Sequence, residues 1–244
     1  MMKSYLLGID IGTSACKVAV FDRNGKVLAA ASGDYPVYYP HEGWAEQNPE
    51  EWWDAVCRAT KETIQKADIT ADEIAGIGID GQSWSAIPID REGNVLANTP
   101  IWMDTRAQSI CDRLNQEIGQ EEIFEVAGNS LQPSYSTAKI LWYKENLPEV
   151  YAKIYKILQS NCYIAFKLTG AVTQDVSQGY GLHCFNMKKG CWDEKMCKRL
   201  GIPMEFLPEI CDCDHVVGTV TGKAAAECGL VEGTPVVAGG LDAA

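Results

Sequence analysis

The sequence lacks the features that mark membrane, secreted or nucleic-acid-binding proteins. It contains no run of about 18 apolar residues, so we expect no membrane span. Residues 1–5 lead straight into a strand-like stretch without the apolar region of a signal peptide, which predicts a cytoplasmic location. Basic residues number 21 against 33 acidic ones, and the net charge of −12 disfavours nucleic acid and anionic membrane as partners. Small-molecule chemistry is the function class that remains.

Metal-binding patterns are also missing. Histidine occurs only three times, and the ten cysteines are scattered without a C-x-x-C pair. Cys211 and Cys213 are the closest pair, and no second pair or histidine set at zinc-finger spacing accompanies them. We therefore expect no metal cluster, and we expect reduced, mostly buried thiols.

The apolar pattern predicts an α/β chain that opens with three consecutive antiparallel strands. Asn24-Gly25 supplies the positive φ that a tight hairpin turn needs. The three opening strands are expected over 5–11, 16–22 and 27–35.

A helix with clear start signals follows. Asn48 is the expected N-cap and Pro49 the first helical residue, and the apolar stripe continues to about Lys66. Further helices are expected between 104 and 146 and over 160–168, and further strands over 74–80, 85–89, 95–101, 154–158, 216–220 and 235–240. Strands mixed with crossover helices predict a mixed sheet that helices flank on both faces.

The segment 8–17 has the composition of a phosphate-binding turn between two strands. Gly12 permits a tight turn and a close backbone approach to an anion. The backbone N–H groups and hydroxyls of Thr13 and Ser14 can hold phosphate oxygens. Lys17 can offset phosphate charge, so the segment indicates an enzyme that uses ATP.

Asp10 ends the buried strand before this turn. Its carboxylate can hold Mg²⁺, directly or through water. The segment matches neither G-x-x-x-x-G-K-[ST] nor G-x-G-x-x-G, so it is neither a helix-linked P-loop nor a dinucleotide fingerprint. An ordinary hairpin with Asp and Thr capping its turn is the alternative. A buried carboxylate needs a partner, which favours the phosphate site.

Asp242 follows an apolar strand-like stretch, 236–238, and the pair Gly239-Gly240. A carboxylate after two glycines can act as a base in a cleft, because the glycines leave room for a substrate. The alternative is a loop aspartate that caps a following helix, and the residues alone leave both readings open.

Six segments in order resemble the FGGY family of carbohydrate kinases, especially its xylulokinase-like branch. The resemblance runs from residue 6 to the last residue. The segments are GIDIGTSACK (8–17), GWAEQNP with the following WW (43–53), GIDGQSW (78–84), IWMDTR (101–106), Ser136 through Lys139 to Trp142, and AGGLDAA (238–244).

The resemblance implies an actin-like ATPase fold of the ribonuclease H type. It also implies a kinase that uses ATP and Mg²⁺ to phosphorylate a sugar or polyol hydroxyl, with a pentulose such as xylulose as the leading substrate. By the resemblance, Asp242 is the general base and Asp10 organises Mg²⁺. The phosphate contacts it implies are Gly12, Thr13, Ser14 and Lys17, and the sugar-site residues are Gln82, Ser83, Trp84 and Asp104.

The chain departs from the xylulokinase pattern at Ser83-Trp84, where that branch usually has Met-His. An indole, which can stack on a sugar face and donate one hydrogen bond, therefore replaces an imidazole. This change argues against xylulose as the substrate. The chain also stops two residues after Asp242. We therefore expect residues 1–244 to form the amino-terminal lobe, without the carboxy-terminal nucleotide lobe and with little activity alone.

Two other functions compete with the kinase. One is a non-catalytic sugar-binding or regulatory module on the same fold, against which stands the presence of both Asp10 and Asp242. The other is an ATPase of the actin or Hsp70 type that acts on a protein partner, which the segments 43–53 and 78–84 disfavour. Family members are often dimers, and the sequence leaves open whether this protein is a homodimer.

Overall fold

The computed structural model describes residues 4–242 of the 244-residue chain. Ala243 and Ala244, which complete the last of the six segments, lie outside the described residues. No helix in residues 4–242 is long and apolar enough to cross a membrane. The cytoplasmic location stays a prediction.

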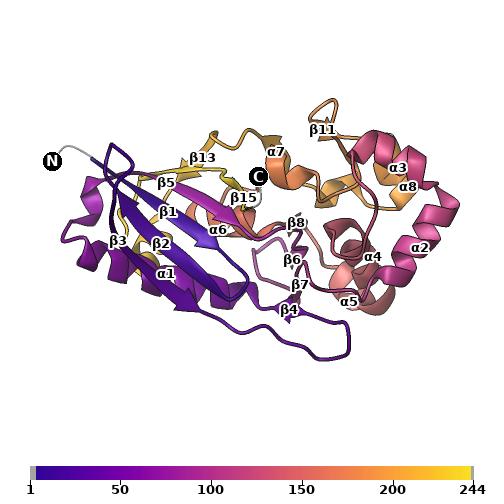
Figure 1. Cartoon of the computed structure of the whole chain (residues 1–244), viewed down its shortest axis with the longest axis horizontal. Helices are drawn as coiled ribbons and strands as arrows, with labels where there is room; N and C mark the ends of the chain where they lie inside the picture. Colours follow the sequence, from indigo (N-terminus) through magenta and orange to yellow (C-terminus); the bar gives the residue numbers. More distant parts are fainter. Residues whose placement is uncertain (1–3, 243–244) are drawn as a thin grey trace.

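A mixed sheet forms one end of the molecule (Figure 1). Its strands follow the order β13-β14-β5-β1-β2-β3, and β15 also pairs with β5. The pairs β1–β2 and β2–β3 are antiparallel, whereas β5 runs parallel to β1, β14 and β15, so the predicted opening of three antiparallel strands is confirmed. The strands are β1 (Tyr5–Ile11), β2 (Ala15–Phe21), β3 (Val27–Asp34), β5 (Ile74–Gly81), β13 (Val216–Thr219), β14 (Pro235–Val237) and β15 (Gly240–Leu241).

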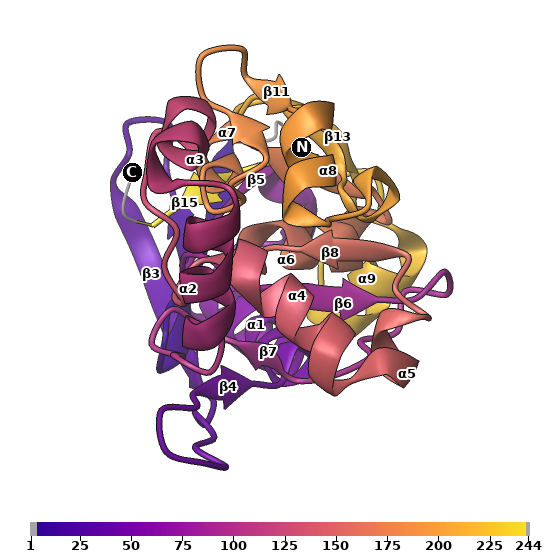
Figure 2. The ribbon, with the colours of Figure 1, turned by 90° about the vertical axis from the view of Figure 1, so that its right-hand side faces the viewer.

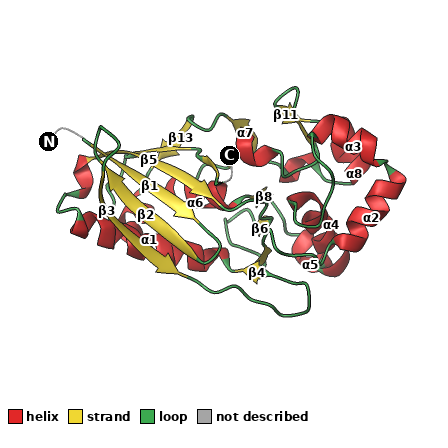
Figure 3. Ribbon diagram, in the orientation of Figure 1, coloured by secondary structure: helices red, strands yellow, loops and turns green. Residues whose placement is uncertain are grey.

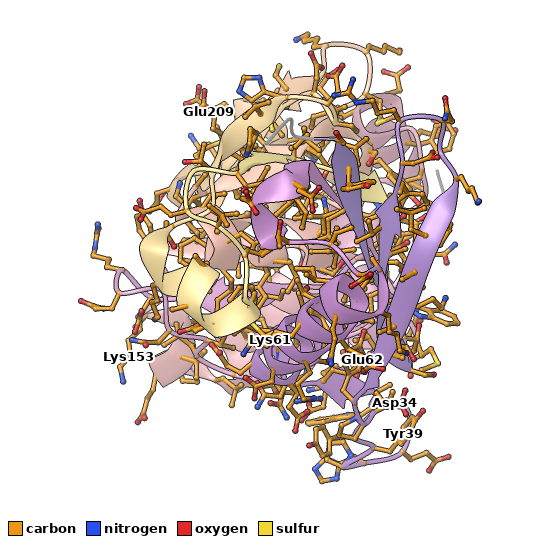
Figure 4. The ribbon with its side chains drawn as sticks, turned by 90° about the vertical axis from the view of Figure 1, so that its left-hand side faces the viewer. Asp34, Tyr39, Lys61, Glu62, Lys153 and Glu209 are labelled. Atoms are coloured by element: carbon orange, nitrogen blue, oxygen red, sulfur yellow. A yellow bond between two sulfur atoms is a disulfide. The ribbon has the colours of Figure 1, made fainter. Side chains whose placement is uncertain are left out.

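Two helices cover one face of this sheet, α1 (Pro49–Lys66) and α6 (Ser160–Thr169), and a third, α9 (Gly222–Cys228), packs against both of them. The side chain of Asn48 accepts a hydrogen bond from the N–H of Glu50, which confirms the predicted N-cap of α1. All three helices join one apolar core with alternate residues of the strands, such as Leu7, Ile9 and Val18. Figure 4 shows α1, which carries the labelled Lys61 and Glu62, on the same side of the strands as the pale yellow α9.

The opposite face of β1, β2 and β5 is open within the described residues. Two hollows of about 520 and 610 Å³ lie on it and share Gly8, Phe21, Gly78 and Val237. Leu6, on the same face, is 52% exposed. The prediction that helices flank the sheet is confirmed. Within residues 4–242 these helices lie on one face only, so the expectation of helices on both faces is wrong for this part of the chain. A nearly continuous apolar run such as 5–9 shows that both faces of a strand tolerate apolar residues, but not which face each helix covers.

The other end of the molecule is mostly helical and has its own apolar core (Figures 1 and 2). Its helices are α2 (Gln108–Glu117), α3 (Gln120–Ala127), α4 (Ser136–Asn146), α5 (Pro148–Tyr151) and α8 (Glu194–Leu200). The short helix α7 (Val176–Gly179) lies between the two ends, against β15 (Figure 1). The breaks predicted near Gly119 and Gly128 separate α2, α3 and α4, and Gly128 takes the left-handed conformation as the cap of α3.

Four short strand pairs lie outside the main sheet (Figure 3). They are β4 (Glu46–Gln47) with β7 (Thr99–Pro100), β6 (Ile87–Ile89) with β8 (Lys156–Leu158), β9 (Thr173–Asp175) with β12 (Glu209–Cys211), and β10 (Phe185–Asn186) with β11 (Cys191–Trp192). Two short 3₁₀ helices complete the described elements, η1 (Ala71–Glu73) and η2 (Met204–Phe206).

The expectation of reduced thiols is wrong for two of the ten cysteines. Cys57 of α1 and Cys228 of α9 form a disulfide across 171 residues of sequence. The pairing depends on the packing of α1 on α9, which the spacing of cysteines along the chain does not reveal. The other eight are free, and Cys16, Cys111, Cys162, Cys184 and Cys197 are buried, as expected.

Candidate active site

The predicted phosphate turn and the predicted base meet at one edge of the sheet. Asp10 of β1 lies in register with Asp80 of β5, and Asp80 in turn lies in register with Gly240 of β15. The N–H of Asp242 donates to the carbonyl of Gly81 at 3.1 Å. Because these strands are parallel, their carboxyl ends gather residues from distant parts of the chain at this edge.

Gly239 permits this arrangement. Its φ of +77° is a left-handed conformation, and a Cβ added there would lie 1.7 Å from the carbonyl oxygen of Ile79. Only glycine allows the chain to pass so close to β5 before it turns into Asp242.

The phosphate turn itself is tightly closed. The N–H of Gly12 donates to the carbonyl of Ala15 at 3.1 Å, and the hydroxyl of Tyr35 donates to the carbonyl of Gly12 at 2.6 Å. The ammonium of Lys17 lies 3.3 Å from a carboxylate oxygen of Asp10, and both side chains reach solvent, with 72% and 33% exposed. A cation and a carboxylate therefore stand next to each other at the open rim of the turn.

Buried amides link this turn to the segment 78–84. The side-chain amide of Gln47 donates to the carbonyl of Thr13 at 2.8 Å. The amide of Gln82, which is 1% exposed, donates to the carbonyl oxygen of the Gln47 side chain at 2.8 Å. Gln82, predicted to line the sugar site, thus connects the two segments from within. Trp102, which is 44% exposed, also reaches the turn, since its indole N–H donates to the hydroxyl of Thr13 at 3.0 Å.

Ser83 and Trp84 lie beside the predicted base. The hydroxyl of Ser83 donates to a carboxylate oxygen of Asp242 at 3.4 Å, across 159 residues of sequence. Trp84 has a φ of +62°, a strained value for a bulky residue that turns its ring onto Tyr135, with the ring centroids 4.2 Å apart. Tyr180 meets the edge of the same indole at 5.9 Å. Ser83, Trp84 and these two tyrosines, Tyr135 and Tyr180, form an aromatic and hydroxyl-bearing surface next to Asp242.

Asp104 has a different setting. It is fully buried, and its carboxylate accepts hydrogen bonds from the N–H of Ala45 and from the backbone and guanidinium of Arg106. Arg106 in turn lies over the ring of Trp44 at 3.9 Å. The lining role predicted for Asp104 stays a prediction, and the carboxylate holds the loop at Ala45.

The carboxylates at the sheet edge fit a loosely held Mg²⁺. Asp10 offers hard oxygen ligands at the rim, whereas no group of three or more His, Cys, Asp or Glu residues in positions 4–242 could hold a metal by itself. Mg²⁺ usually keeps several waters and binds one or two carboxylates together with substrate phosphates, so a single aspartate is compatible with it. Burial, reinforced by the charges of Asp10 and Asp242, raises the pKa of Asp80 to about 6.

Sequence reasoning missed Asp80, Tyr135 and Tyr180. A signal for Asp80 was present, because Gly78-Ile79-Asp80 repeats Gly8-Ile9-Asp10, and the two tripeptides pair in parallel register. No sequence signal marks Tyr135 and Tyr180, because they lie 51 and 96 residues from Trp84 along the chain and contact it only in the folded structure.

Comparisons with known proteins give one consistent family. The model of the FGGY family of carbohydrate kinases, N-terminal domain, matches residues 5–244. The xylulose kinase of Bacillus subtilis is 32% identical over 98% of this chain and 48% of its own length. The glycerol kinase of Thermococcus gammatolerans is 31% identical over 89% of this chain and 45% of its own length.

A solved structure agrees. The crystal structure of gluconate kinase from Lactobacillus acidophilus superimposes with a TM-score of 0.90 at 30% identity, covering 98% of this chain and 48% of that one. The chain therefore spans about half the length of the relatives it matches.

Proposed function

The chain belongs to the FGGY family of carbohydrate kinases, and on that premise we propose that it supplies the sugar-binding and base-bearing half of an ATP-dependent kinase for a sugar or polyol. Residues 1–244 then correspond to the amino-terminal lobe. A pentulose such as xylulose is the first substrate to test, and ATP with Mg²⁺ is the phosphoryl donor.

The contact between Ser83 and Asp242 carries the proposal. It joins the segment that resembles the family's sugar-site turn to the carboxylate that resembles its catalytic base. Asp10 and Lys17 stand at the end of the neighbouring strand, where a phosphate-bearing substrate would lie. Base, sugar surface and phosphate turn thus share one sheet edge, which supports phosphoryl transfer to a bound hydroxyl.

In the proposed reaction, the carboxylate of Asp242 accepts the proton of a sugar hydroxyl as its oxygen attacks the γ-phosphorus of ATP. The bond from that phosphorus to the bridging oxygen breaks, and ADP leaves. Lys17 and the backbone of the turn offset the phosphate charge, and Mg²⁺ near Asp10 would supply further charge neutralisation. Phosphoryl transfer depends chiefly on such positioning and charge stabilisation, and a positioned base contributes roughly 10²–10⁴-fold.

The surface next to Asp242 suits an uncharged polyhydroxyl substrate. Trp84, Tyr135 and Tyr180 provide aromatic faces for C–H groups, and Ser83 provides a hydroxyl. None of these four side chains carries a positive charge that could neutralise a substrate carboxylate. We therefore expect ketoses and polyols to be preferred over aldonates such as gluconate.

The test is ATP-dependent phosphorylation by the complete protein that carries this chain, with pentuloses, polyols, hexoses and gluconate as substrates. We expect an uncharged sugar or polyol to be phosphorylated, and Asp242→Asn to lower kcat roughly 10²–10⁴-fold. Failure to phosphorylate any of these compounds would sink the proposal. Full activity of Asp242→Asn on the best substrate would remove Asp242 as the base.

A further inference from the structure

The short helix α7 lies against β15, the strand that leads to Asp242. Its N-cap, Asp175, is fully buried, and each of its carboxylate oxygens is engaged. One oxygen accepts from the side-chain amide of Asn161 at 2.8 Å, and the other accepts from the N–H of Gln178, also at 2.8 Å. Neighbouring groups on several elements therefore fix the orientation of this carboxylate.

Ser177 connects Asp175 to the strand before Asp242. Its hydroxyl donates to Asp175 at 2.6 Å and accepts from the N–H of Leu241 at 2.9 Å. Because Asp175 takes the hydroxyl proton, the lone pairs of Ser177 are directed at the Leu241 amide. Leu241 is the residue immediately before Asp242, so this amide is one of the last fixed points ahead of the carboxylate.

Gln178, next along α7, reaches the sugar-site turn. Its side-chain amide donates to the carbonyls of Gly81 and Gln82 at 3.3 and 3.2 Å. The carbonyl of Gly81 also accepts from the N–H of Asp242 at 3.1 Å. One helical turn thus holds the strand before Asp242 through Ser177 and the sugar-site turn through Gln178.

We propose that Ser177, oriented by Asp175, is a positioning residue that sets the carboxylate of Asp242 against the substrate hydroxyl. The inference rests on the proposed function, in which Asp242 is the base. Ser177 touches no reacting atom; it acts through the Leu241 amide. Reacting groups must lie within a few tenths of an ångström of their productive places, and a misplacement of about 1 Å can cost on the order of 10²-fold in rate.

The activity test compares Ser177→Ala and Ser177→Thr in the complete protein, with ATP and its best sugar. Ser177→Ala removes the acceptor, so we expect kcat to fall roughly 10- to 100-fold while KM changes less than about threefold. Ser177→Thr keeps the γ-oxygen and is expected to restore most of kcat. Equal losses in the two variants, or a change confined to KM, would overturn the proposal.

A second measurement does not depend on activity. Hydrogen exchange of the Leu241 amide, measured by NMR or by mass spectrometry of a peptide covering it, should accelerate in Ser177→Ala and stay slow in Ser177→Thr. Asp193→Asn is the matched control, because Asp193 caps α8 as Asp175 caps α7 but contacts neither the strand before Asp242 nor the sugar-site turn in the described structure. Unchanged exchange at Leu241 in Ser177→Ala would contradict the proposal.

Asp242→Asn, assayed beside these variants, separates the two hypotheses. If Asp242→Asn is inactive while Ser177→Ala is fully active, the inference about Ser177 fails and the proposed base stands. If Asp242→Asn is active, the proposed base fails, whatever Ser177→Ala does.

Discussion

Lys139 is a fully buried lysine that joins separate segments of the candidate site. Its ammonium donates to the carbonyl of Trp84 at 2.8 Å and to that of Ile101 at 2.9 Å. A third hydrogen bond, at 2.6 Å, reaches the carbonyl of Ser134. Trp84 belongs to the aromatic surface, Ser134 directly precedes Tyr135 of that surface, and Ile101 lies on the loop before Asp104, so one side chain joins these segments.

Replacing this lysine should therefore destabilise the folded chain. In Lys139→Met the three carbonyls lose their donor inside the protein, and we expect the free energy of unfolding to fall by roughly 2–4 kcal/mol. The measurement is a urea unfolding curve. Lys144→Met, on the same helix but exposed, is the control and should change stability by less than about 0.5 kcal/mol. Equal behaviour of the two variants would contradict the role assigned to Lys139.

Asp80 predicts a pH dependence of stability. Its pKa in the folded chain, about 6, lies above the ordinary value of 3.8, so the folded state binds its proton more tightly than the unfolded state does. The stability that this proton contributes is complete below pH 3.8 and is lost as the pH rises through 6. Asp80→Asn should thus stabilise the chain at pH 8, by on the order of 1 kcal/mol or less because Asp80 is exposed and its charge is screened by water, and should change little at pH 4.

Asp90→Asn provides a control of opposite sign. Hydrogen bonds from Asn94 and the backbone lower the pKa of Asp90, so its carboxylate form stabilises the turn at neutral pH. Urea midpoints at pH 4 and pH 8 for both variants are the measurement. A loss of stability in Asp80→Asn at pH 8 would show that Asp80 is better accommodated as a charge.

At the scale of elements, the placement of β15 depends on Gly239. In Gly239→Ala the new methyl group would overlap the carbonyl of Ile79, so β15 must move away from β5 and take Asp242 with it. We expect the kinase activity of the complete protein to be lost. Gly170→Ala is the matched control: it has a similar φ, +79°, with nothing within 4 Å, and should cost only about 1 kcal/mol of stability. Retained activity in Gly239→Ala would contradict the geometry of this strand.

The elements that the sequence predicted well are those whose signals are local. The opening strands, the turn at Gly25 and the capped helix α1 each follow from residues within a few positions of one another. The candidate site was predictable where a motif carries it, as at Asp10 and Ser83. The meeting of Ser177 with Leu241 and of Trp84 with Tyr135 joins distant segments through packing, and no local pattern encodes it.

At the scale of the whole molecule, the disulfide between α1 and α9 closes a loop of 171 residues. Closing so long a loop restricts the unfolded chain and stabilises the fold by about 2–5 kcal/mol in the usual chain-entropy account. We expect thiol labelling of the denatured, unreduced chain to find eight cysteines and labelling after reduction to find ten. Cys57→Ser should lower the melting temperature. Ten reactive thiols without reductant would show that the bridge does not form.

Trp102 can serve as an intrinsic fluorescent probe of the phosphate turn. Its half-exposed indole is hydrogen-bonded to the hydroxyl of Thr13, a residue expected to turn toward a phosphate. Indole emission shifts in wavelength and intensity when such a bond is broken or its solvent shell changes. The chain thus carries an intrinsic fluorescent probe at the turn proposed to bind phosphate, and Trp102→Phe measures the share of the signal that comes from Trp102 among seven tryptophans. Binding of a phosphate-bearing ligand to the turn could be followed in this way before the sugar or polyol that accepts the phosphoryl group has been identified.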